Sequence, residues 1–178
     1  MPDFLRNDPP TNEMLGDGNK FMDYVKRKGT WEILESDFKL AKKYLQDNGA
    51  ENIFLIGFCW GAKMVMAASA HDPSYKGGAC VHPSLLVAED FEKANAPMIV
   101  LPSQNERDFT EDFKLIQAKP FGKLCYMQRF DDMIHGWCAA RGEWQDSAVA
   151  ARANEAFTIV ASGFKSILSS SCCPKSHH

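Results

Sequence analysis

Short apolar runs alternate along this chain with longer segments of helical periodicity. The clearest run, 53–58 (Ile-Phe-Leu-Ile-Gly-Phe), is continuous and has the length of a strand that is buried on both faces. Over 30–46, apolar residues recur at helical spacing, which predicts an amphipathic helix. Such alternation is typical of a parallel sheet covered by helices, so the sequence predicts an α/β fold.

The remaining elements are predicted from the same two patterns. Strands are expected at 78–82, 97–101 and 123–130, and helices at 60–70, 88–94, 109–117 and 146–168. The opening before residue 30 is rich in Pro, Asn and Asp, and the end of the chain is small, polar and aperiodic. We therefore expect one domain over 1–168 and a flexible tail over 169–178.

The composition argues against several classes of protein. The chain has 178 residues, 45% of them hydrophobic and 24% charged, which suits one globular domain. With 20 Lys and Arg against 23 Asp and Glu, the net charge of -3 provides no basic field for nucleic acid. No apolar run approaches the length of about 20 residues that a membrane-spanning helix needs. The start lacks a secretory signal and the six cysteines lack the spacing of a disulfide framework, so we expect a cytoplasmic protein.

One pentapeptide, 57–61 (Gly-Phe-Cys-Trp-Gly), lies between the strand at 53–58 and the helix expected after it. A G-x-C-x-G sequence in this context predicts a nucleophile elbow, in which the two glycines let strand and helix approach closely. Cys59 at its apex would face the positive end of the helix, which favours the thiolate, and the N–H of Trp60 would stabilise an oxyanion. The alternative is that Cys59 is simply a small buried residue.

A thiol nucleophile needs a base, and the chain has five histidines. His177 and His178 lie in the tail and His71 lies in a polar turn, which leaves His82 and His135. His135 follows the last predicted strand and precedes the last helix, the position of the catalytic histidine in α/β-hydrolases. We therefore predict His135 as the base, with a turn histidine bonded to the backbone as the alternative.

The loop 102–108, after the strand at 97–101, contains two candidate acids. Glu106 or Asp108 would orient His135 and stabilise its imidazolium form. We favour Glu106 and keep Asp108 as the alternative, and either residue can instead be a solvated loop carboxylate.

These residues resemble the dienelactone hydrolase family, also called carboxymethylenebutenolidases, which are α/β-hydrolases with cysteine in place of serine. The motifs that carry the resemblance are 2–4 (Pro-Asp-Phe), 57–61, 97–106 and 135–142 (His-Gly-Trp-Cys-Ala-Ala-Arg-Gly). The resemblance covers most of the chain. It implies a three-layer sandwich with a mostly parallel sheet, and a triad of nucleophile, base and acid at the three positions identified above.

The resemblance also implies substrate-binding residues. Arg6 and Arg141 lie in the neighbourhoods where the family binds a substrate carboxylate, which a guanidinium holds with two hydrogen bonds. Either arginine can equally be an ordinary surface residue. His82, Trp60 and Trp137 are expected to line the pocket, with a structural role as the alternative.

Compared with the family, the chain lacks the strands that precede the Pro-Asp-Phe segment. The resemblance implies that one of their loops donates the second oxyanion N–H. We therefore expect either a truncated domain or a rearranged sheet edge that pairs with another copy of the chain.

The sequence thus predicts a cysteine-dependent hydrolase that cleaves small carboxylic esters or enol-lactones through a thioester. No metal or organic cofactor is called for, and the expected partner is the small-molecule substrate. One alternative is a catalytically impaired, truncated hydrolase domain that acts as a binding or dimerising module. A redox-responsive thiol protein is another, weakly supported by Cys172 and Cys173.

Overall fold

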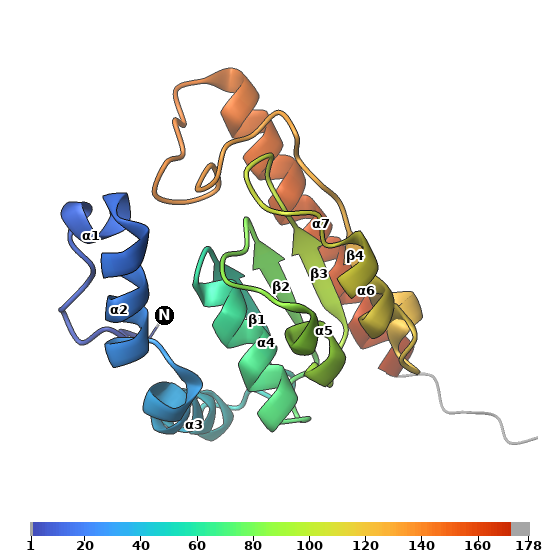
Figure 1. The fold of residues 1–178 in the computed structure, drawn as a ribbon. Coiled ribbons are helices and arrows are strands. Elements are labelled where there is room, and N and C mark those ends of the chain that lie inside the picture. The colour runs from blue at the N-terminus through green and yellow to red at the C-terminus, as the bar shows by residue number, and fades with distance from the viewer. Residues whose placement is uncertain (1, 172–178) are drawn as a thin grey trace, which may run out of the picture. The chain divides into compact units, whose positions relative to one another are not determined.

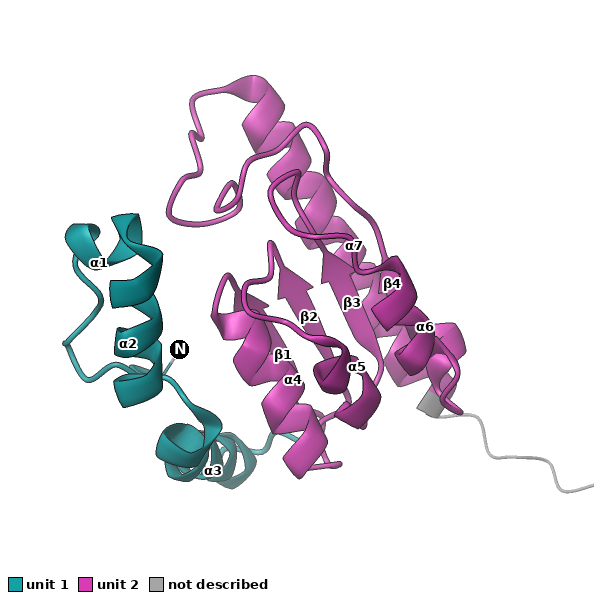
Figure 2. Ribbon diagram, viewed as in Figure 1, with its two compact units in different colours: residues 1–51 teal, residues 52–178 magenta. Residues whose placement is uncertain are grey.

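The computed structural model describes residues 2–171, with helices and strands arranged as in Figure 1. The chain divides into two compact units, Met1–Glu51 and Asn52–His178 (Figure 2). The last helix runs through Ser171, past the predicted end of the domain at residue 168. The rest of the predicted tail, 172–178, lies outside the described residues.

The first unit contains three helices, α1 (Asn12–Gly16), α2 (Gly18–Lys28) and α3 (Trp31–Asp47). The sequence predicted only α3, which it placed at 30–46. The side chains of Thr11 and Asp17 accept hydrogen bonds from first-turn N–H groups of α1 and α2 and so begin both helices. The polar opening therefore contains two short helices.

The second unit contains a sheet of four parallel strands in the order β1-β2-β3-β4 (Figure 1). The strands are β1 (Phe54–Phe58), β2 (Gly77–Val81), β3 (Met98–Leu101) and β4 (Tyr126–Met127). Because the strands are parallel, the loops that follow them meet at one edge of the sheet. β1 lies at one side of the sheet.

The strand predicted at 123–130 is broken. A 3₁₀ helix, Gly122–Leu124, precedes the two-residue β4. Beyond β4 the backbone still follows β3 and its loop, because Gln128 and Phe130 donate to carbonyls of that segment. An isolated bridge to Ser103 completes this irregular edge.

Helices cover both faces of the sheet. The helices α4 (Gly61–His71), α5 (Ala88–Lys93) and α6 (Thr110–Gln117) pack on one face, and α7 (Ser147–Ser171) packs on the other. Their bounds agree with the predicted helices to within a few residues. The predicted α/β class and its three layers are therefore confirmed.

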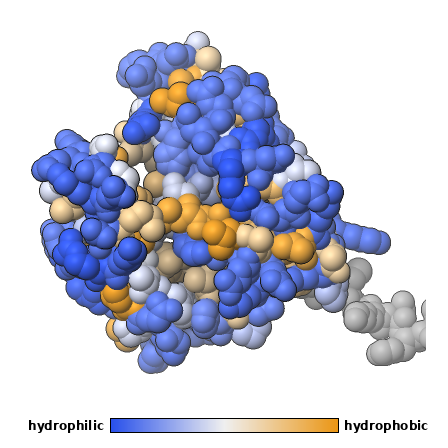
Figure 3. Space-filling model, viewed as in Figure 1, coloured by the Kyte–Doolittle hydropathy of each residue, from blue (hydrophilic) through white to orange (hydrophobic). Residues whose placement is uncertain are grey.

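Hydrophilic side chains predominate on the face that Figure 3 shows, with hydrophobic side chains in a band between them. Within residues 2–171, no helix combines the length and the hydrophobicity needed to cross a membrane.

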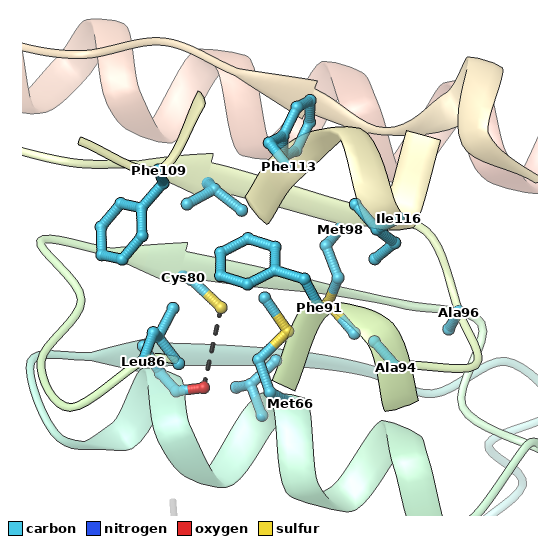
Figure 4. Close-up of a cluster of buried hydrophobic side chains, with 13 residues drawn as sticks. Met66, Cys80, Leu86, Phe91, Ala94, Ala96, Met98, Phe109, Phe113 and Ile116 are labelled. Carbon is cyan, nitrogen blue, oxygen red and sulfur yellow. Dashed lines mark hydrogen bonds between the residues drawn. The ribbon is translucent and has the colours of Figure 1, made fainter. Parts of the chain in front are cut away.

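Side chains of the central strands alternate between two cores, as period-two strand geometry requires. Cys80 and Met98 point toward α4, α5 and α6, where they meet Phe91 and Ile116 (Figure 4). Val100 belongs to the same core. The Cys80 thiol lies 3.7 Å from the carbonyl oxygen of a residue in α4 (dashed in Figure 4).

The other core contains Ala79, Val81, Ile99 and Leu101 with Ala153, Ala156 and Val160 of α7. These cores hold the carboxyl ends of β1, β2 and β3 in place.

Candidate active site

The turn between β1 and α4 is sharp, and a half-buried cysteine stands at its apex. Cys59 has a φ of +53°, in the left-handed region that non-glycine residues seldom occupy. A Cβ at Gly57 would overlap the backbone of Gly61, whereas a Cβ at Gly61 would meet open space. The close approach of strand and helix therefore requires glycine at 57. The prediction that both glycines are needed is wrong for Gly61.

The end of β2 holds the backbone of Cys59 on both sides. Its N–H donates to the carbonyl of Val81 at 3.1 Å and to Nδ1 of His82 at 3.2 Å. Its carbonyl accepts the N–H of Ser84 at 3.0 Å. These contacts keep the strained turn in place.

The Cys59 sulfur lies among hydrogen-bonding groups. Its Sγ is 3.4 Å from Oγ of Ser84, and the His135 ring and the N–H of Trp60 interact favourably with its charged form. Burial alone would raise the pKa of the Cys59 thiol, but the hydrogen bonds and the charge of His135 outweigh it and lower that pKa. The site therefore favours a thiolate.

The His135 ring is held from its other side by a carboxylate. Nδ1 of His135 lies 2.7 Å from Oε1 of Glu106, and Nε2 lies 3.5 Å from Oγ of Ser84. Interactions of the protonated ring with the acceptors Cys59 and Glu106 raise the pKa of His135 to about 9. A thiolate beside an imidazolium is the arrangement that these pKa directions favour.

Glu106 is fixed by its own loop. Its side chain is 6% exposed and accepts the N–H of Ser103 and, at 3.0 Å, the Ser103 hydroxyl. Burial alone would raise the pKa of Glu106, but the hydrogen bonds from His135 and Ser103 lower it. Asp108 instead accepts the N–H and hydroxyl of Thr110 at the start of α6. Of the two predicted acids, Glu106 is therefore the one in contact with His135.

His82 lies beneath the site as a neutral ring. It is 1% exposed, and its ring centroid lies 5.0 Å from that of His135. Because Cys59 donates to Nδ1, the ring proton sits on Nε2, which has no partner among residues 2–171. Burial and the nearby charge of His135 lower the pKa of His82 to about 4.

A cavity of about 460 Å³ opens beside His135 and Glu106. Its lining comes from the segments that follow β2, β3 and β4, and comprises Pro83, Ser84, Leu85, Leu86, Asn105, Glu106, Arg107, Phe109 and His135. Cys59 is not in this lining, although Ser84 and His135, which its sulfur contacts, both are. Within the described residues, His, Cys, Asp and Glu side chains form no cluster able to hold a metal ion.

The chain matches the sequence model of the dienelactone hydrolase family over residues 1–168. The chain belongs to the dienelactone hydrolase family. An uncharacterized AIM2 family protein of Schizosaccharomyces pombe is 31% identical over 157 residues, which are 82% of this chain and 62% of that protein. A carboxymethylenebutenolidase homologue of Rattus norvegicus is 24% identical over 147 residues, which are 80% of this chain and 60% of the homologue. The chain therefore spans about three fifths of the length of these relatives.

A solved structure supports the fold of this dienelactone hydrolase family member. The crystal structure of a protein from Klebsiella pneumoniae subsp. pneumoniae, assigned to the dienelactone hydrolases, superposes with a TM-score of 0.69. The match covers 92% of this chain and 73% of the Klebsiella chain, at 16% sequence identity. At that identity the likeness concerns the fold alone.

The residues His82, Trp137 and Arg141, implied as substrate-binding by the resemblance to dienelactone hydrolases, are not part of the cavity lining. Trp137 is 1% exposed and packs on Phe130 in the core beside α7, and His82 is equally buried. Arg141 is exposed, and its stem lies over Gly136, the residue after His135. Their burial gives His82 and Trp137 a supporting position behind the site.

The other predicted residues are placed as follows. Arg6 belongs to the first unit, where it pairs with Asp37 at 2.7 Å. Trp60 stands at the start of α4, and its N–H points to the sulfur. Cys172, Cys173, His177 and His178 lie outside the described residues.

Three further residues of the candidate site were not predicted from the sequence. Ser84 contacts both Cys59 and His135. The Arg107 guanidinium lines the cavity, donates to a backbone carbonyl of the opposite loop and pairs with a carboxylate of α6. Arg129 donates to three carbonyls of the acid loop. All three follow strands of the parallel sheet, which is the signal that points to them.

Proposed function

We propose that this dienelactone hydrolase family member is a cysteine-dependent hydrolase of small carboxylic esters or enol-lactones. The supporting observation is the chain of contacts from Glu106 through His135 and the Ser84 hydroxyl to the Cys59 sulfur. A base fixed by a buried carboxylate and bonded to a nucleophile is the arrangement that acyl transfer needs.

In the first half-reaction, the Cys59 thiolate forms a C–S bond to the substrate carbonyl carbon, and the carbonyl electron pair moves to oxygen. The N–H of Trp60, already at the sulfur, donates to this oxyanion. The C–O bond then breaks, and the leaving oxygen takes the proton from Nε2 of His135. The product of this step is a thioester on Cys59.

In the second half-reaction, water attacks the thioester while His135 takes its proton. The C–S bond breaks, the carboxylic acid leaves, and the pair of thiolate and imidazolium returns. A thiolate expels a poor leaving group badly, so lactones with an enol leaving group suit this site better than amides. The apolar side of the cavity, Leu85, Leu86 and Phe109, suits a small substrate.

The reaction as written uses no metal and no organic cofactor. Its reactive thiol needs a reducing compartment, and we propose the cytosol. Cys59, Cys80, Cys125 and Cys138 are all free, which supports that choice.

Turnover of p-nitrophenyl acetate tests the proposal. We expect steady turnover by the wild type and none by Cys59→Ala. Mass spectrometry of the quenched reaction should find an acetylated protein for the wild type and not for Cys59→Ala. Cys125→Ala is the matched control, because Cys125 is a half-buried thiol that packs against the core beside α4. It should retain the wild-type rate.

Equal rates for wild type and Cys59→Ala would exclude the proposal. Absence of turnover by a folded protein with a titratable Cys59 would favour the binding or dimerising module instead.

A further inference from the structure

The loop after β2 carries a hydroxyl between the nucleophile and the base. Oγ of Ser84 lies 3.4 Å from Sγ of Cys59 and 3.5 Å from Nε2 of His135. Ser84 also lines the cavity. Nothing in the triad chemistry described above uses this hydroxyl.

The backbone fixes the position of this hydroxyl. The N–H of Ser84 donates to the carbonyl of Cys59 at 3.0 Å, so both residues are held as a pair. The flanking His82 and Leu85 have φ values of +37° and +64°, in the left-handed region. Strained backbone before and after Ser84 indicates that the loop holds this side chain in one position, directed at the site.

A hydroxyl has one proton to donate and lone pairs to accept, so Ser84 can serve both protonation states of the site. With a neutral thiol, the S–H donates to Oγ and the O–H donates to Nε2 of His135. With the thiolate, N–H of the imidazolium donates to Oγ and the O–H donates to the sulfur. Passing from the first state to the second moves one proton from S to Oγ and one from Oγ to Nε2.

We propose that Ser84 is a positioning residue whose hydroxyl links the Cys59 thiol to the His135 imidazole and holds the thiolate ready for attack. This inference rests on the proposed function, because that function makes the thiolate the nucleophile. The contacts of Ser84 with Cys59 and His135 do not depend on the identity of the substrate. The O–H of Ser84, a second donor beside the imidazole, also helps to lower the pKa of the Cys59 thiol against the opposing effect of burial.

The pH dependence of Cys59 alkylation by iodoacetamide tests the inference without any ester. We expect Ser84→Ala to raise the midpoint by about one pH unit, a roughly tenfold loss of thiolate below both midpoints. Ser84→Thr keeps the hydroxyl and should keep the wild-type midpoint. Ser74→Ala, which removes a hydroxyl bound to Asp72, is the control and should also leave the midpoint unchanged.

A second pair of variants separates the hydroxyl from packing. Ser84→Thr and Ser84→Val differ only by a hydroxyl in place of a methyl group, so only the valine variant should raise the midpoint. An unchanged midpoint in folded Ser84→Ala, or equal midpoints for the threonine and valine variants, would overturn the inference.

The two proposals fail in distinguishable ways. A raised midpoint with no Cys59-dependent ester hydrolysis would retain the role of Ser84 and remove the proposed function. Cys59-dependent hydrolysis with the same midpoint in every Ser84 variant would do the reverse.

Discussion

Oε1 of Glu106 lies 2.7 Å from Nδ1 of His135, on a carboxylate that Ser103 already holds. Replacing it by an amide keeps the shape but not the charge that stabilises the imidazolium. We expect Glu106→Gln to lower kcat for p-nitrophenyl acetate by roughly 100- to 10 000-fold, with little change in KM.

Asp108→Asn is the matched control for Glu106→Gln. Asp108 lies two residues further along the same loop, is exposed, and bonds Thr110 instead of His135. Its amide variant should keep kcat within about twofold, because an amide oxygen still accepts those bonds. A comparable loss of kcat in both variants would mean that the loop, not the carboxylate, matters.

Gly57→Ala tests the close approach of β1 and α4. The added Cβ would overlap the backbone of Gly61, which cannot rotate away, so we expect the free energy of unfolding to fall by about 3 kcal/mol or more. Gly61→Ala adds the same methyl group to open space within a helix and should be neutral or stabilising by up to about 1 kcal/mol. Urea unfolding measures both, and equal losses would contradict the geometry of the elbow.

The left-handed backbone at Cys59 predicts a conflict between stability and activity. Any residue with a Cβ is strained at a φ of +53°. The free energy of unfolding of Cys59→Gly should therefore exceed that of Cys59→Ala by about 1 kcal/mol, as measured by urea unfolding. Neither variant should hydrolyse esters. Ala161→Gly, in an exposed part of α7, should change stability in the opposite sense. A Cys59→Gly variant no more stable than Cys59→Ala would show that the turn is unstrained.

The neutral His82 predicts how acid destabilises the fold. Its pKa is lowered from 6.5 to about 4 in the folded protein. Between these two pH values, His82 is therefore mostly protonated in the unfolded chain and mostly neutral in the folded chain. The stability from His82 is therefore complete above pH 6.5 and is lost as the pH falls toward 4, by at most about 1.4 kcal/mol per pH unit.

His82→Asn keeps an acceptor for the N–H of Cys59 but removes the titration. The difference in unfolding free energy between wild type and variant should shrink as the pH falls through this range. A constant difference would contradict a buried neutral ring.

Local patterns were sufficient to predict β1, α4 and the position of Cys59 at the turn between them, because strand, turn and helix are consecutive. The position of His135 followed from element order. Ser84 was missed because its partners lie 25 and 51 residues away, and only the parallel sheet brings their loops together. The choice between Glu106 and Asp108 likewise depended on the path of one loop, which no spacing rule specifies.

The first unit shows a different limit. α1 and α2 were not predicted because their mainly polar sequence shows no clear apolar face. Thr11 and Asp17, the capping residues that begin these helices, were the available signal. The strand at 123–130 was predicted as continuous, but Phe130 pairs with the loop after β3, beyond the end of that strand.

Arg129 joins the acid loop through the carbonyls of Ser103, Glu106 and Arg107. The guanidinium reaches these carbonyls from two separate nitrogens, Nη1 and Nη2, a rigid arrangement that the single nitrogen of a lysine does not offer. The orientation of the acid thus depends on a cation that meets none of the reacting atoms. A substitution of Arg129 would therefore alter the turnover rate through the position of Glu106, without changing the side chains that line the cavity.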